Sequence, residues 1–229
     1  MKRKIVISLL AGLGMSLGAT AQAQNAWDAV SDFNLGANPN GAWGYHWQEP
    51  AGGALFPMAA GTDCGNASVI CWTRFEGNPL PQIGLNTSTG PLESGSNLAP
   101  LGVLLLHPGA SGERAVVTWK APHTTGKVRY FVNGQFQLLD FHNFHYGLSG
   151  VNVSVNVEGK VGKPPVTLTR FGQFMKFELN NCLSPGQTVS FTVDANGNYA
   201  NDLTALKVGI LRSREFDETV PEQRAACPG

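Results

Sequence analysis

Charge is scarce in this 229-residue chain. Only 14% of its residues are charged, and the 16 basic and 16 acidic side chains leave no basic excess to neutralise phosphates, so nucleic acid is not an expected partner. Glycine shows no three-residue period, which excludes a collagen helix. Hydrophobic residues make up 42% of the chain. This share is too high, and the charge is too low, for a disordered protein. The composition therefore predicts one folded domain of ordinary size.

Motifs that identify a reaction are also missing. The chain contains no G-x-S-x-G, no H-E-x-x-H and no phosphate-binding glycine loop. No spacing of acidic residues singles out the two facing carboxylates that glycosidic hydrolysis requires. Asp140, His142 and His145 are the candidate acid–base or metal-binding group, provided that they lie in a loop, because His142 and His145 would point to opposite faces of a strand. The alternative is that these histidines are ordinary polar loop residues.

No hydrophobic run is long enough to span a membrane as a permanent anchor. The start of the chain carries Lys2, Arg3 and Lys4, then an apolar run from Ile5, then the small-residue pattern that ends at Ala23. This pattern predicts a secretory signal peptide over residues 1–23 and a single domain over residues 24–229. We therefore expect a secreted or periplasmic bacterial protein with no membrane span after cleavage.

Export favours disulfide bonds between the four cysteines, because oxidising compartments stabilise them. We expect Cys64 to pair with Cys71 in a short loop, and Cys182 to pair with Cys227, which would tie the tail to the body. A zinc site is the alternative, although the chain has no C-x-x-C and its cysteine spacings match no zinc pattern.

The body of the chain has the alternating pattern of β-strands. Apolar and polar residues alternate over 115–119, 151–157, 175–179, 188–193 and 206–210, and no window predicts a helix of ten residues. Asn133-Gly134, between two apolar segments, predicts a hairpin. Residues 25–100 are rich in turn-forming residues, so we expect one strand pair there, followed by long loops. The fold expected is all-β, an antiparallel sandwich or barrel stapled by disulfides.

Two clusters are candidates for ligand binding. Trp43, Tyr45 and Trp47 alternate, so in a strand they share one face. If that face is exposed, the three rings could stack on sugar rings, whereas if it faces inward they are core residues. The second cluster offers oxygen ligands suited to calcium, or alternatively a tight turn in which side chains bond to the local backbone; its members are Asp194, Asn196, Asn198, Asn201 and Asp202.

Three segments carry a resemblance to a known group of proteins. They are D-F-x-x-x-x-N-P-N-G-x-W-x-Y over residues 32–45, H-P-G…V-x-x-W-x-A-P over 107–122, and G-N-x-x-x-D-x-T over 197–204. In these segments the chain resembles the jelly-roll, carbohydrate-binding-module-like exported domain of bacterial PEP-type C-terminal sorting proteins. Val220-Pro221-Glu222 is similar to the sorting motif, but Gln223 replaces its second proline, and we expect no anchoring by that route.

The resemblance implies a jelly-roll sandwich that binds glycans or cell-surface polymers by shape and aromatic stacking, and this is the function we expect. One alternative is a secreted enzyme that acts on an extracellular polysaccharide through Asp140 with His142 or His145, for which product release would be diagnostic. Another is a structural or adhesive exoprotein, for which a large exposed apolar patch or a stable oligomer would be diagnostic.

Overall fold

The computed structural model describes residues 24–75, 78–124, 126–141, 150–213 and 227. In this part of the chain the regular elements are β-strands, and no helix is present that is long and apolar enough to cross a membrane. The predicted signal peptide over residues 1–23, the candidates His142 and His145, and the segment 220–223 lie outside the described residues.

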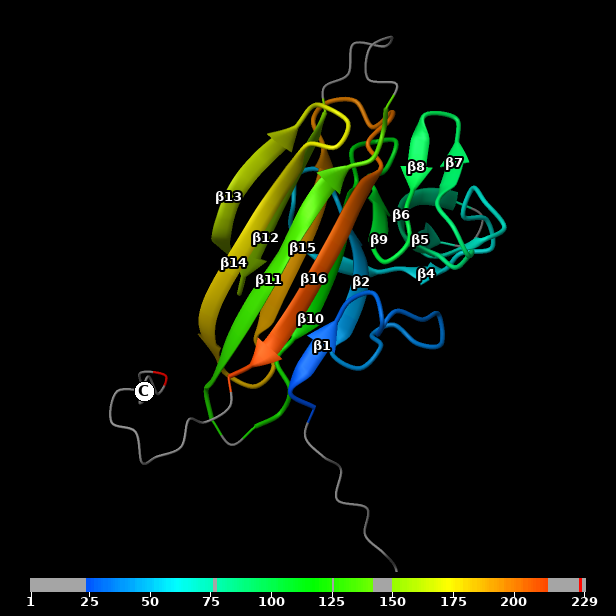
Figure 1. Cartoon of the computed structure of the whole chain (residues 1–229). Coiled ribbons are helices and arrows are strands. Elements are labelled where there is room, and N and C mark those ends of the chain that lie inside the picture. Colours follow the sequence, from blue (N-terminus) through cyan, green and yellow to red (C-terminus); the bar gives the residue numbers. More distant parts are fainter. Residues whose placement is uncertain (1–23, 76–77, 125, 142–149, 214–226, 228–229) are drawn as a thin grey trace, which may run out of the picture.

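The strands form two antiparallel sheets packed face to face, with a short hairpin beside them (Figure 1). The larger sheet has the order β14-β11-β16-β9-β6-β5-β4, with β1 paired to β16. Its strands are β14 (Phe174–Leu183), β11 (Val128–Leu138), β16 (Thr204–Arg212), β9 (Leu104–His107), β6 (Asn78–Asn86), β5 (Val69–Phe75), β4 (Ala59–Ala60) and β1 (Ala26–Asp28).

The second sheet has the order β13-β12-β15-β10-β2-β3. Its strands are β13 (Lys160–Leu168), β12 (Val151–Val157), β15 (Thr188–Ala195), β10 (Arg114–Lys120), β2 (Trp43–Gln48) and β3 (Leu55–Pro57), and the separate hairpin joins β7 (Leu92–Ser94) to β8 (Asn97–Ala99). From β10 onward the chain passes repeatedly from one sheet to the other, as in a jelly roll. The predicted all-β antiparallel sandwich is confirmed.

The core lies between the two sheets and is formed by the alternating positions that the sequence predicts. In β12 the valines at 151, 153 and 155 are fully buried while their neighbours are half-exposed. Across the core, Trp119 of β10 meets Trp27 and Tyr130 edge-on, with ring centroids 5.2 and 4.9 Å apart. Such aromatic pairs add to the hydrophobic gain of burying both sheet faces. The alternation therefore defines the inner face of each strand.

The predicted hairpin at Asn133-Gly134 is wrong, because β11 continues straight through it. Asn133 pairs with Glu178 of β14 on one side and with Gly209 of β16 on the other. A Cβ at Gly134 would lie 2.3 Å from the carbonyl oxygen of Lys207 and 2.6 Å from the ring of Phe177. Glycine is present here because neighbouring strands approach closely, and not because the chain turns.

The long loops expected over residues 25–100 are replaced in part by paired strands. β5 and β6 form an antiparallel hairpin within the larger sheet, and β6 also pairs with β9. Pro79 and Pro81 argue against a strand, but they precede the segment of β6 that pairs with β9 and lie where its register with β5 shifts. The prolines therefore occupy positions that need not donate to a regular ladder.

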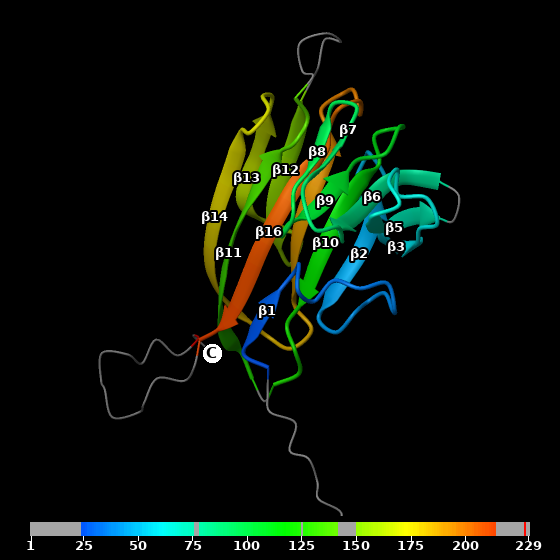
Figure 2. The same cartoon turned by 45° about the vertical axis from the view of Figure 1, so that its right-hand side comes forward.

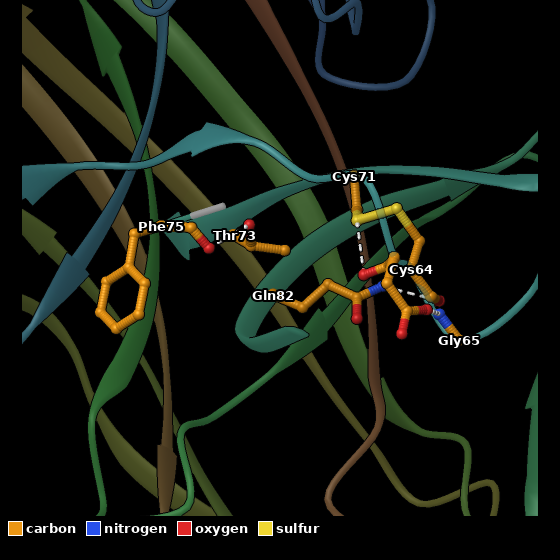
Figure 3. The surroundings of a disulfide bond; sticks show 7 residues. Cys64, Gly65, Cys71, Thr73, Phe75 and Gln82 are labelled. Carbon is orange, nitrogen blue, oxygen red and sulfur yellow. Dashed lines mark hydrogen bonds between the residues drawn. A yellow bond between two sulfur atoms is a disulfide. The ribbon is translucent and has the colours of Figure 1, made fainter. Parts of the chain in front are cut away.

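Both predicted disulfides are confirmed. Cys64 is bonded to Cys71 at the start of β5, and Cys182 of β14 is bonded to Cys227 (Figure 3 shows the first pair). All four cysteines are therefore disulfide-bonded, and the alternative of a zinc site is excluded for them.

Candidate functional site

The predicted aromatic face of β2 points mainly into the core. Trp43 and Tyr45 are 1% and 0% exposed, because β2 lies against β10 and these residues sit opposite the inward-facing Trp119 and Val117. The interpretation of Trp43 and Tyr45 as ligand-binding residues is therefore wrong, since their rings cannot reach a ligand. Only Trp47, at the end of the strand, is half-buried and reaches toward the surface.

An aromatic surface does exist, but around Trp47 alone and with partners that the sequence did not indicate. Phe56 of the edge strand β3 lies opposite Trp47, and their rings stack with centroids 4.6 Å apart. The guanidinium of Arg74 lies 4.1 Å from the Trp47 ring and 5.5 Å from the ring of Phe75. We call Trp47, Phe56, Arg74 and Phe75 the aromatic edge. It joins the second sheet to β5 of the larger sheet.

Two rings of the aromatic edge are open to solvent. Phe56 is 40% exposed and Phe75 is 52% exposed. Leu55, beside Phe56 in β3, is also exposed. Large apolar side chains that gather on one surface, instead of being scattered singly, are typical of a binding surface.

The cation at the centre of the aromatic edge is held in place. Arg74 forms an ion pair with Glu113, which is almost fully buried. The other carboxylate oxygen of Glu113 accepts a hydrogen bond from the backbone nitrogen of Ser111 at 3.0 Å. Because its carboxylate partner is fixed, the guanidinium is oriented against the aromatic rings, where cation–π attraction adds to the ion pair.

Polar groups next to the aromatic edge are bonded to one another. Arg114 donates to Gln48 at 3.2 Å and to Asp194 at 2.9 Å. His46, which precedes Trp47, lies 3.1 Å from the hydroxyl of Thr118, and burial lowers the pKa of its imidazole. His46 is therefore neutral near pH 7.

Three of the five predicted calcium ligands are engaged by other groups of the protein. Asp194 accepts from Arg114, the side chain of Asn196 accepts from Asn152 at 3.3 Å, and Asn198 accepts from the backbone of Ala200 at 3.0 Å. The last contact is that of an Asx turn. In the part of the chain that the structure describes, no three His, Cys, Asp or Glu residues form a group that could hold a metal ion.

Asp140, the candidate catalytic carboxylate, is completely buried, and it lies close to Asp202, which is 1% exposed. The hydroxyl of Ser96 donates to Asp140 at 2.7 Å. Burial, and next the charges of Asp140 and Asp194, raise the pKa of Asp202 to about 8. The sequence did not indicate this pairing, because the two aspartates are far apart along the chain. An acid–base role for Asp140 with His142 or His145 stays a prediction.

A polar hollow of about 360 Å³ adjoins the Cys64–Cys71 loop, and its lining comes from residues 61–67, 69 and 70 with Leu35. Figure 3 shows this disulfide at one end of β5 and Phe75 at the other. The hollow has no aromatic ring in its lining, so it offers no surface on which a sugar could stack.

Comparisons with known proteins give distant likenesses only. No family model matches the chain, and no curated protein matches it. A solved structure of CBM35 from Paenibacillus barcinonensis is 10% identical, with 83% of this chain and 98% of that chain covered and a TM-score of 0.32. CBM51 from Clostridium perfringens GH95, in complex with methyl-galactose, is also 10% identical, with 55% and 81% covered and a TM-score of 0.31.

The C-terminal domain of EclA, described as a sugar-binding protein, is 14% identical, with 41% of this chain and 64% of that chain covered and a TM-score of 0.32. The fold of the present chain is established by its own strand order and register.

Proposed function

We propose that this protein is a secreted glycan-binding module and that the aromatic edge is its binding surface. The observation that carries the proposal is a continuous surface with two exposed rings. The exposed Phe56 stacks on Trp47, and the Arg74 guanidinium, held by a buried carboxylate, lies over the rings of Trp47 and the exposed Phe75. The C–H faces of sugar rings pack against flat aromatic rings, and sugar hydroxyls accept hydrogen bonds from guanidinium groups. The aromatic edge offers both kinds of contact on one surface.

The expected affinity is weak. A phenylalanine side chain has ~200 Å² of surface, so covering the exposed part of Phe56 or Phe75 would contribute about 2 kcal/mol for each ring. Together they would supply about 4 kcal/mol, which corresponds to a dissociation constant of about 1 mM. The entropy lost on association reduces this gain, whereas hydrogen bonds from Arg74 add to it. Binding in the millimolar range to a repeating polymer fits this surface.

The proposed location is outside the cytoplasm. Two disulfides, one of which closes a loop with a sequence separation of 45, are typical of proteins that fold in an oxidising compartment. The predicted signal peptide over residues 1–23 would deliver the chain there.

The test compares four forms of the mature, oxidised protein on native gels that contain soluble polysaccharides. Wild type is run beside Phe56→Ala, Phe75→Ala and the control Phe174→Ala. Phe174 is a close match for Phe75, because it is 54% exposed and has a cation, Lys176, 5.4 Å from its ring, but it lies on β14. We expect one or more polysaccharides to retard wild type and the control, and to retard both aromatic-edge variants far less.

Equal retardation of all four forms would overturn the placement of the site on the aromatic edge. Mass spectrometry of the polysaccharide after incubation checks the function itself. New oligosaccharides would favour the enzyme over the binding module, whereas no retardation by any polysaccharide, together with a stable oligomer, would favour the structural or adhesive protein.

A further inference from the structure

The register of three strands brings together polar residues that are distant in the sequence. Asn97 of β8 forms an isolated antiparallel bridge with Asp140, just beyond the end of β11. β11 and β16 pair up to Leu138 opposite Thr204, and the backbone of residue 139 then bonds to that of residue 203 at 2.8 Å. Extending this register by two positions places Asp140 opposite Asp202. Residues opposite one another in a sheet project to the same face.

The resulting cluster is buried and rich in side-chain oxygens. Asp140 and Asp202 are 0% and 1% exposed. The Ser96 hydroxyl lies 2.7 Å from Oδ2 of Asp140 and 2.9 Å from Oδ1 of Asn201, but its single proton can serve only one of these oxygens.

Two buried oxygens of this cluster, Oδ2 of Asp202 and Oδ1 of Asn97, have no hydrogen-bond partner among the residues that the structure describes. Leaving buried oxygens unsatisfied costs about 1–3 kcal/mol each, and more when they carry charge.

A bound cation can contact several of these oxygens at once, whereas a hydrogen bond satisfies only one of them. We propose that Asp140, Asp202, Asn97 and Asn201 form a calcium-binding site between β8, the end of β11 and the start of β16. The available ligands are all oxygens, which suit hard cations, and the two carboxylates balance one divalent charge. Calcium accepts six to eight oxygens in a flexible arrangement, whereas magnesium demands a near-ideal octahedron, so calcium is the better fit.

This site differs from the one predicted from the sequence. Of the five residues in the predicted cluster, Asn201 and Asp202 are shared, whereas Asp194 is committed to Arg114 and Asn198 to the turn at Ala200. The site is also separate from the aromatic edge, with which it has no residue in common.

A bound calcium ion would hold the β7–β8 hairpin to the body of the sandwich. The hairpin forms its own two-stranded sheet. It is joined to the residues after β11 by backbone hydrogen bonds from Leu98 to Leu139 at 3.1 Å and from Phe141 to Ser96 at 3.0 Å (Figure 2 shows β8 near this end of β11 and β16). Ligands from three segments would make the cation a structural clamp.

The test measures calcium binding directly and needs no glycan. The mature, oxidised protein is stripped with EDTA and titrated with calcium chloride in a calorimeter, and native mass spectrometry counts the bound ions. We expect one calcium ion per chain and weaker binding of magnesium. At a calcium concentration 100 times the dissociation constant, the unfolding equilibrium constant falls about 100-fold. For a domain of this size the melting temperature then rises by about 5–10 °C.

Variants locate the ion. Asp202→Asn and Asp140→Asn keep the shape of the side chain while removing one charge, and we expect each to lose the calcium-dependent rise in melting temperature. Asp194→Asn, from the set predicted by sequence, should keep it. Absence of bound calcium in the wild type overturns the proposal even if no variant folds, and so does an unchanged calcium response in Asp202→Asn. Failure of the glycan experiment would leave both results unaffected.

Discussion

In the absence of cations, the wild type should lose stability as pH rises, and replacing Asp202 by asparagine should abolish this loss. Burial beside Asp140 raises the pKa of the Asp202 carboxyl to about 8 in the folded protein, against about 4 in an unfolded chain. A carboxyl with a raised pKa contributes stability that is fully present below pH 4 and is lost as pH rises through 8, because the unfolded state releases its proton first.

The magnitude follows from the gap between the two pKa values. Each pH unit between about 4 and 8 costs about 1.4 kcal/mol, so the whole window costs at most about 6 kcal/mol. Asparagine carries no charge, and Asp202→Asn should lack this loss. In EDTA the variant should therefore be less stable than the wild type or equal to it at pH 4, and more stable by a few kcal/mol at pH 8.

The assay is urea denaturation of both proteins in EDTA at several pH values from 4 to 8.5, followed by fluorescence. The difference between wild type and variant isolates residue 202, because other titrating groups are common to both. Saturating calcium should reverse the order at pH 8, since the cation stabilises the ionised carboxylate only in the wild type. Parallel pH profiles for the two proteins in EDTA would refute the reasoning.

Three further changes test the packing of the sandwich by urea denaturation. Gly134→Ala should destabilise by several kcal/mol, because its Cβ would lie 2.3 Å from a carbonyl oxygen of β16. Gly126→Ala should be nearly neutral, because its Cβ would meet no atom within 4 Å from the described residues other than its chain neighbours; similar effects of the two changes would contradict the close approach of the strands. Tyr45→Phe should stabilise by about 1 kcal/mol, because the buried hydroxyl has no hydrogen-bond partner in the part of the chain that the structure describes, and a clear loss would show that a partner exists. Replacing Cys182 and Cys227 by alanine should cost about 4 kcal/mol for the 45-residue separation, and an unchanged stability would show that the bond does not constrain the unfolded chain.

Patterns that are local in the sequence predicted the fold well. The alternation over 151–157 identified β12 because one face of that strand is buried and the other is not. The cysteine pairing followed from a short loop and a distant tail. The hairpin at Asn133-Gly134 failed because a dipeptide that favours a turn also suits a central strand where neighbours crowd the backbone.

The aromatic edge was harder to predict from local patterns in the sequence. Trp43, Tyr45 and Trp47 share one face, but alternation does not say whether a face is inside or outside, and the paired strand β10 makes it the core. Phe56 and Phe75 lie in segments that were expected to be loops. They belong to one surface only because β3 and β5, which are in different sheets, both contribute to the contacts around Trp47 and Arg74.

Asp140 and Asp202 are distant in the sequence, and they likewise come together only through the register of β11 and β16. No local pattern in the sequence contains this register.

Fluorescence quenching of Trp47 tests the central claim most directly. Four of the five tryptophans are 5% exposed or less, and only Trp47 is within reach of acrylamide in the solvent. A polysaccharide that occupies the aromatic edge should shield this residue, so the quenchable fraction should fall with the same concentration dependence as gel retardation in wild type and in Phe174→Ala. If a polysaccharide retards the protein while the quenching of Trp47 stays unchanged, the glycan binds elsewhere and the account of this surface is wrong.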